Sequence, residues 1–181
     1  MILNLVRYDN EILSTPAKKF DFKEPPFDPL EFAMNLVETM NAHGALGLAA
    51  VQVGVPYRVI AIPAQPNIVM YNPIIVDKSE ETMDLDEGCL TYPGLILKMK
   101  RSRIVKVRYA QPNGNVVTEK YTDHAARAIQ HEIDHIDGLT ILTSRTGMER
   151  YTAQKKWAKI VRRTGGAPAS IRNSSVMEKS A

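Results

Sequence analysis

Residues 123 to 138 read DHAARAIQHEIDHIDG, and the rest of the chain must be arranged around this stretch. Thr122 or Asp123 can cap the start of a helix, and Gly138 suits the position just beyond its end. The apolar residues recur at helical spacing, at Ala125, Ile129, Ile133 and Ile136. Because Ala128 and the histidines occupy another side, few positions are left for solvent. The sequence therefore predicts a largely buried central helix.

Two histidines stand four residues apart in this helix. The spacing of His131 and His135 places both imidazoles on one helical face, where they can bind one metal ion. Glu132 lies beside them, within reach of a water molecule on that metal. A solvated helix with histidines placed by chance is the alternative, but half of the chain's 4 histidines have this spacing, which favours the metal site. The motif alone does not separate one class of metallohydrolase from another.

Cys89 is the leading candidate for a third ligand, which a catalytic metal site with an open position usually needs. It lies in the segment EGCLTYP, residues 87 to 93, where Gly88 permits a close backbone approach. The thiol can ionise when it coordinates a metal. Taken alone, a buried cysteine acting as a small apolar residue is as good an explanation. Beside the histidine pair the ligand is favoured, because the third ligand would otherwise have to be another carboxylate or histidine that no motif marks.

A third segment, GALGLAAVQVG at residues 44 to 54, combines small residues with one amide side chain. Small residues let a backbone approach a ligand closely, and Gln52 offers a donor for a developing oxyanion. Considered by itself, this segment is better explained as a glycine-rich turn after the first helix.

The remaining elements follow from residue periodicity. Asp28-Pro29 favours a helix start, and the pattern predicts a helix over 28 to 42. The apolar stripe expected to face the core is formed by Leu30, Ala33, Met34, Val37 and Met40. Segments rich in β-branched and aromatic residues predict strands at 58 to 63, 68 to 75, 104 to 109 and 116 to 122. Strands mixed with a few helices, without regular alternation, predict an α+β domain.

The C-terminal part begins with a predicted helix over 149 to 163. Its apolar residues lie among six basic ones and are Tyr151, Trp157, Ile160 and Val161. We expect the apolar side to pack on the domain and the cations to face outward. Residues 1 to 163 are thus predicted to form a single catalytic domain, and the small, polar tail at 164 to 181 is expected to be disordered.

Composition narrows the possible environment of the protein. A chain of 181 residues that is 44% hydrophobic suffices for one domain with a real core. A formal charge of +3 is too weak to indicate a specific nucleic-acid partner, and a single cysteine excludes an internal disulfide framework. The N-terminal residues 1 to 9 lack the long apolar run of a signal peptide, and no stretch approaches the roughly 18 apolar residues of a membrane span. We therefore expect a cytoplasmic protein without a membrane partner.

Taken together, the three segments resemble the peptide deformylase family. That family carries a glycine-hydrophobic-glycine-hydrophobic-Ala-Ala-x-Gln segment, a Glu-Gly-Cys-Leu-Ser segment and a Gln-His-Glu-x-Asp-His segment, in that order. In this chain they correspond to residues 45 to 52, 87 to 91 and 130 to 135. The resemblance spans about residues 1 to 163, and three ordered motifs make it specific. It implies a fold of antiparallel sheets around the motif helix.

The resemblance also implies an activity and a set of site residues. The metal ligands would be Cys89, His131 and His135, and Glu132 would be the general base. The Gln52 amide and the Leu90 backbone N–H would stabilise the oxyanion. The reaction would be hydrolysis of a linear amide: removal of the formyl group from the N-terminal formylmethionine of nascent proteins, with release of formate. One divalent ion is implied, physiologically Fe²⁺, although these ligands also accept Zn²⁺, Ni²⁺ or Co²⁺.

Further residues are candidates for contacts around this site. Leu46, Gly47 and Ala128 are expected to contact substrate, with plain core packing as an equal alternative for Leu46 and Ala128. Glu87 and Asp134 are candidates to orient the ligands or Arg101, with ordinary surface charges as the alternative. The chain departs from the family pattern at Ala45, Thr91 and Ile96, where the family usually has glycine, serine and, in many bacterial members, arginine.

Two other functions remain open on the residues alone. A zinc endopeptidase would also use two histidines and a glutamate, but such enzymes generally take a carboxylate or a third histidine as their remaining ligand. A binding module with a structural metal would not need Glu132 or Gln52. For a deformylase, the resemblance implies nascent formylmethionyl peptides as substrates and docking on the ribosome through the basic C-terminal helix.

Overall fold

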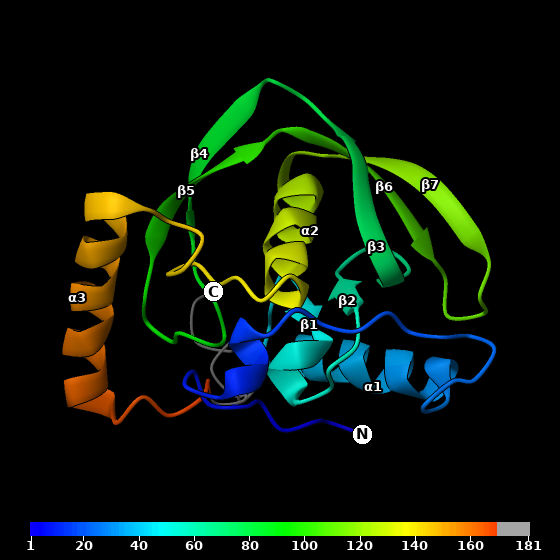
Figure 1. The fold of residues 1–181 in the computed structure, drawn as a ribbon, viewed down its shortest axis with the longest axis horizontal. Helices are drawn as coiled ribbons and strands as arrows, with labels where there is room; N and C mark the ends of the chain where they lie inside the picture. Colours follow the sequence, from blue (N-terminus) through cyan, green and yellow to red (C-terminus); the bar gives the residue numbers. More distant parts are fainter. Residues whose placement is uncertain (170–181) are drawn as a thin grey trace, which may run out of the picture.

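The helix α2 (Asp123–Ile136) lies in the middle of the molecule, between two antiparallel sheets, as the computed structural model shows for residues 1 to 169 (Figure 1). The larger sheet has five strands in the order β1 (Leu48–Ala49), β2 (Val59–Ile62), β3 (Ile68–Lys78), β6 (Ile104–Ala110) and β7 (Val116–Thr122). The smaller sheet is the hairpin of β4 (Thr82–Glu87) and β5 (Leu97–Ser102). The prediction of an α+β fold around a buried motif helix is confirmed.

The main core forms between α2 and the larger sheet. Ile129 and Ile136 are fully buried, and they pack with inward-facing residues of β2 and β6 such as Ile60 and Val107. Gly138 has φ +76°, and a Cβ there would lie 2.9 Å from the Ser14 carbonyl oxygen. The helix therefore ends where predicted, because only glycine combines this conformation with so close an approach.

The helix α1 (Pro29–Ala42) also begins as predicted, since the Asp28 carboxylate accepts hydrogen bonds from the backbone at Leu30 and Glu31. The predicted buried stripe is wrong at two positions: Leu30 is 56% exposed and Met34 66% exposed. Instead, Phe32, Leu36 and Met40 lie against the sheet together with Ala33. The large aromatic Phe32 lies on the buried side of the helix and packs against Phe27 in a tilted arrangement, so Leu30 and Met34 are left on the exposed side.

The helix α3 (Gly147–Thr164) lies along the outside of the molecule, beyond the β4–β5 hairpin (Figure 1). Trp157 is buried, as predicted, and its ring contacts the rings of Tyr8 and Tyr92 edge-on, each at a centroid distance of 5.1 Å. Gly165 caps the end of the helix in the left-handed conformation, and Gly166 is buried against Tyr8. The prediction for residues 170 to 181 lies outside the described residues.

Two short 3-10 helices, η1 (Glu11–Ser14) and η2 (Ala50–Val53), complete the elements of the described residues. The segment η2 directly follows β1 and lies against α2, so it brings the glycine-rich segment to the motif helix. Within residues 1 to 169, no helix combines the length and the apolar character needed to cross a membrane.

Candidate metal centre

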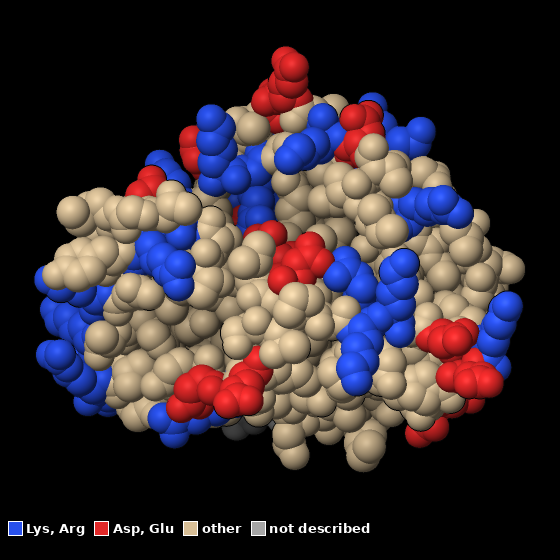
Figure 2. Space-filling view, in the orientation of Figure 1, with Lys and Arg blue, Asp and Glu red and all other residues tan. Residues whose placement is uncertain are grey.

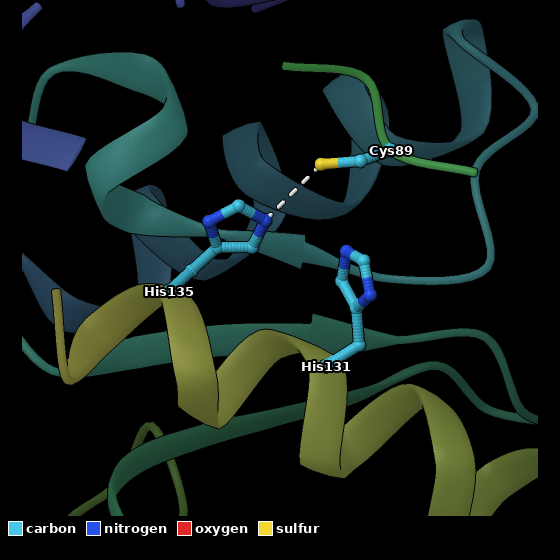
Figure 3. Close-up of side chains that lie close together, drawn as sticks. All are labelled: Cys89, His131 and His135. Carbon is cyan, nitrogen blue, oxygen red and sulfur yellow. Dashed lines mark hydrogen bonds between the residues drawn. The ribbon is translucent and has the colours of Figure 1, made fainter. Parts of the chain in front are cut away.

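Three predicted ligands from two distant parts of the chain meet at one point (Figure 3). His131 and His135 project from the same face of α2, with their ring centroids 5.1 Å apart. Cys89 reaches them from the loop after β4, and its Sγ lies 3.2 Å from Nε2 of His135. One ligand atom from each residue lies within 4.8 Å of the others. These three atoms are close enough together to bind a single metal ion.

Glu87, the last residue of β4, sets the orientation of one imidazole. Its Oε2 lies 3.0 Å from Nδ1 of His131, so the opposite ring nitrogen of His131 is left for a metal. Arg101 donates to both carboxylate oxygens of Glu87, at 3.0 Å each, and to Asp134 at 2.6 Å. Burial would raise the pKa of Glu87, but the hydrogen bonds from His131 and Arg101 outweigh it and lower this pKa to about 2. The expectation that Glu87 and Asp134 orient a ligand and Arg101 agrees with these contacts.

The electrostatics of Cys89 favour the thiolate, which is the form that binds metals. Burial alone would raise the pKa of the Cys89 thiol, but the neighbouring His135 and His131 hold it well below its ordinary value. A thiolate with two imidazoles is a ligand set that suits zinc, iron, nickel and cobalt. Both the geometry and the chemistry of the three side chains therefore fit a divalent transition-metal ion.

Glu132 lies beside the ligands with a carboxylate oxygen that lacks a partner. The side chain is only 4% exposed, and its Oε2 is buried without a hydrogen bond to any of the described residues. Burial raises the pKa of Glu132 to about 7. Gly47 makes room for this carboxylate, because a Cβ at Gly47 would lie 2.5 Å from Oε1 of Glu132. Gly47, which was predicted to contact substrate, is thus also needed sterically, because a larger residue there would collide with the Glu132 carboxylate.

Two candidate oxyanion donors lie on the Cys89 side of the centre. Gln52, in η2, is fixed by the Ala49 N–H, which donates to its Oε1 at 2.9 Å. Its amide nitrogen donates to Thr91 Oγ1 at 3.2 Å and lies 3.7 Å from the Cys89 sulfur. Threonine at position 91 keeps the hydroxyl of the usual serine, and this hydroxyl accepts the hydrogen bond from Gln52. The Leu90 N–H donates to no partner within residues 1 to 169, so it can serve a substrate.

The predicted substrate-contact residues occupy different environments. Leu46 is 73% exposed, whereas Ala128 is half-buried and packs against the main core around α2. The departure at Ala45 strains no backbone, because the positive φ in this turn falls on Gly44 instead. Ile96 is 55% exposed, and its side chain lies against Gly88, next to the candidate ligand Cys89.

One residue of the site was missing from the sequence-based prediction. Arg127 is 7% exposed and contacts Glu87 and three backbone carbonyl groups of the β4–β5 hairpin. It could have been identified as a charged residue within a helix that was predicted to be buried. A buried guanidinium needs hydrogen-bond partners, so its presence there indicates a polar contact.

Comparison with known proteins gives one consistent result. A model of the polypeptide deformylase family matches residues 2 to 151. A peptide deformylase of Fusobacterium nucleatum is 32% identical over 166 residues, covering 91% of this chain and 95% of that protein. A peptide deformylase of Pseudothermotoga lettingae is 38% identical over 130 residues, covering 72% of this chain and 76% of that protein.

Solved structures that resemble this chain are also peptide deformylases. The chain is similar to a peptide deformylase from Ehrlichia chaffeensis, with a TM-score of 0.78 and 31% identity over 90% of this chain and 98% of the other. It is also similar to a peptide deformylase from Legionella pneumophila, with a TM-score of 0.80 and 27% identity over 93% of this chain and all of the other.

Proposed function

The chain belongs to the peptide deformylase family, and from this premise we propose which of its residues carry out the reaction. It is a metal-dependent hydrolase that removes the formyl group from the N-terminal formylmethionine of nascent proteins, releasing formate. The family membership that the three motifs indicated is confirmed. Neither a zinc endopeptidase nor a binding module agrees with this family.

Cys89, His131 and His135 are the residues that would hold the metal ion, and their convergence is the observation that carries the proposal. When bound, such an ion lowers the pKa of its water ligand, so that a hydroxide nucleophile becomes available near neutral pH. Glu87 keeps the His131 ring in the orientation that points its free nitrogen toward the other two ligands. The ion itself is proposed to be Fe²⁺, with Zn²⁺, Ni²⁺ or Co²⁺ as substitutes for the same ligand set.

Glu132 moves the proton. We assign it the role of general base that takes a proton from water as the formyl carbon is attacked, and of general acid that returns the proton to the leaving amine. Two features support the assignment: its carboxylate oxygen is free of protein partners among the described residues, and burial raises its pKa to about 7. A group with a pKa near the working pH can both accept and release the proton.

Gln52 and Leu90 stabilise the negative charge that develops on the formyl oxygen. The side-chain amide of Gln52 is held beside the cysteine ligand, and the Leu90 N–H is available in the adjoining loop. Donors already in place cost no reorganisation during the reaction. Leu46, Gly47 and Ala128 are proposed to contact the methionine residue of the substrate, next to the general base.

The cellular setting is proposed from the same premise. We place the enzyme in the cytoplasm, where nascent chains carry the formyl group, and we propose that it docks on the ribosome through α3. The exposed cations of this helix support that proposal, because ribosomal RNA presents a dense array of phosphates.

Hydrolysis of three substrates tests the proposed chemistry. Formyl-Met-Ala, acetyl-Met-Ala and a peptide with only internal amide bonds should be compared with the enzyme loaded with a single divalent metal. We expect rapid hydrolysis of the formyl peptide alone. Metal analysis of Cys89→Ser and His135→Ala tests the ligands, since each variant removes one of three. Full stoichiometric metal with normal activity in Cys89→Ser would contradict the proposed set.

A further inference from the structure

One side of α2 is attached to the β4–β5 hairpin by polar side chains. Arg127, Gln130 and Asp134 fall at positions i, i+3 and i+7, and therefore lie on the same side of the helix. The Gln130 amide pairs with both backbone groups of Ser102, at 2.8 and 3.1 Å. Asp134 accepts a hydrogen bond from Arg101 at 2.6 Å. The hairpin that leads to Cys89 is thus fixed to the helix that carries both histidines.

Arg127 makes the contacts that span both strands of this hairpin. One terminal nitrogen donates to the Met83 carbonyl of β4 at 2.6 Å, and both terminal nitrogens donate to the Met99 carbonyl of β5 at 3.1 Å. The same guanidinium forms an ion pair with Glu87 Oε1. With only 7% of the residue exposed, water cannot replace these bonds. A planar fork of donors suits such a set of acceptors, whereas a lysine ammonium is a point charge.

Arg127 thereby acts on the metal centre through Glu87. The Oε2 atom of Glu87 faces the His131 ring, and its Oε1 atom is held between Arg127 and Arg101. Glu87 is also two residues before Cys89, so a shift at this point moves a ligand and the orienting partner of another ligand together. We infer that Arg127 is a positioning residue of the metal centre, which holds the end of β4 at the distance from α2 that the three ligands require.

The inference rests on the proposed ligands Cys89, His131 and His135, and it goes beyond them to a residue that touches neither metal nor substrate. Partners behind metal ligands typically affect metal affinity or activity by about 10- to 100-fold. The expected signature is therefore a looser metal site, not merely a less stable fold.

Arg103 supplies a matched control. It also links the base of the same hairpin to the same helix, through Glu81 at 2.7 Å and Asp123 at 2.8 Å. Its side chain is 46% exposed, and neither of its partners touches a ligand. Replacing Arg103 removes an arginine bridge of similar form while the surroundings of Glu87 stay intact.

The test compares the full-length Co²⁺ forms of the wild type, Arg127→Met, Arg127→Lys and Arg103→Met. The rate of Co²⁺ loss to a chelator, the visible absorption spectrum of the bound cobalt, and kcat and KM for formyl-Met-Ala should be measured. We expect Arg127→Met to lose cobalt at least about ten-fold faster than the wild type, with an altered spectrum and a lower kcat. Arg127→Lys should fall between the two, and Arg103→Met should stay within about two-fold of the wild type.

Cobalt loss and spectra in Arg127→Met that match those of Arg103→Met would overturn the inference, even if Arg127→Met melts at a lower temperature. If Arg127→Met does not fold, Arg127→Lys carries the test, and wild-type behaviour of that variant overturns the inference. A wild-type spectrum without a thiolate-to-cobalt band would overturn the proposed ligand set and the inference together. The failure of each proposal is therefore distinguishable.

Discussion

Glu132 and Gly47 bring two of the three motifs into direct contact. The carboxylate occupies the space that any side chain larger than hydrogen at position 47 would need. The sequence suggested Gly47 as a substrate contact, but it could not show that Glu132 fills the space above it. Two motifs that lie 85 positions apart, at 47 and 132, therefore depend on each other at the level of single atoms.

Glu132→Gln should retain metal and lose most of the deformylase activity. The amide has nearly the same shape as the carboxylate, so the ligands stay in place, but it cannot accept and return a proton. We expect a fall in kcat of about 10²- to 10⁴-fold. Metal content and rate should be measured on the same preparation, beside His131→Ala as the variant that loses metal. Joint loss of metal and activity in Glu132→Gln would make Glu132 a structural residue or a ligand.

Gly47→Ala should displace Glu132 without removing a ligand, because the new Cβ would meet Oε1 at 2.5 Å and Cγ at 2.8 Å. We expect stoichiometric metal together with a fall in kcat of at least about 10-fold, since misplaced catalytic groups are costly. Rates and metal content should be compared with Glu132→Gln. An unchanged kcat would show that Glu132 can act from a shifted position.

Gln52→Ala should lower kcat more than it raises KM, because its donor matters most for the charged intermediate. Loss of one oxyanion donor typically costs about 10²- to 10³-fold in rate. Steady-state kinetics on formyl-Met-Ala give both constants. If KM alone increases, Gln52 is a residue that positions the substrate.

The three proposed metal ligands could be selected from the sequence because their signals are local and chemical. His131 and His135 needed only helical spacing, and Cys89 needed only the rule that a catalytic site has a third ligand. Arg127 was not predictable in the same way. Its partners include main-chain carbonyls of Met83 and Met99, and a sequence does not show which carbonyls a fold leaves next to a helix.

At the scale of elements, the strands that could be predicted from the sequence are those rich in β-branched and aromatic residues. The strands β2, β3, β6 and β7 contain the β-branched and aromatic residues that favour extended structure, and all four were predicted. The hairpin strands β4, TMDLDE, and β5, LKMKRS, were missed because their alternating charged residues give little strand propensity. Pairing holds them instead: Asp84 lies opposite Lys100 and Asp86 opposite Lys98.

Trp157→Ala should detach α3 from the domain. The Trp157 ring is 6% exposed and fills the space between Tyr8 and Tyr92. A buried tryptophan replaced by alanine typically costs about 3–5 kcal/mol. The matched control on the same helix is Tyr151→Ala, because Tyr151 is 51% exposed and should change stability by less than about 0.5 kcal/mol. Urea unfolding followed by circular dichroism measures both, and equal effects would contradict the docking role of Trp157.

At the scale of the whole molecule, the position of the charges matters more than their sum. The formal net charge is only +3, yet Lys and Arg gather over α3 at the left edge of the molecule (Figure 2). Six exposed cations of this helix form no salt bridge within residues 1 to 169, and five of them lie between positions 155 and 163: Lys155, Lys156, Lys159, Arg162 and Arg163. Because Trp157 is buried against the domain, the opposite side of α3, which carries these cations, faces outward.

These five cations should bind the ribosome in a salt-dependent manner. Each contact with an RNA phosphate releases counterions, so affinity should fall steeply as the salt concentration rises. Replacing all five by glutamine should weaken binding and flatten the salt dependence, while hydrolysis of formyl-Met-Ala stays near normal, because α3 contributes none of the proposed ligands. Co-sedimentation with ribosomes at several salt concentrations measures the first effect, and a peptide assay measures the second.

The control for that experiment removes the same charge from another part of the surface. Five exposed cations on the two sheets serve this purpose, namely Lys78, Lys100, Lys106, Arg108 and Lys120. If charge alone attracted the enzyme to ribosomal RNA, both sets of glutamine substitutions would reduce binding equally. Docking through α3 requires that only the helix variant bind weakly and that the sheet variant sediment like the wild type. Equal binding by all three proteins would mean that the cations of α3 are simply a solvated face.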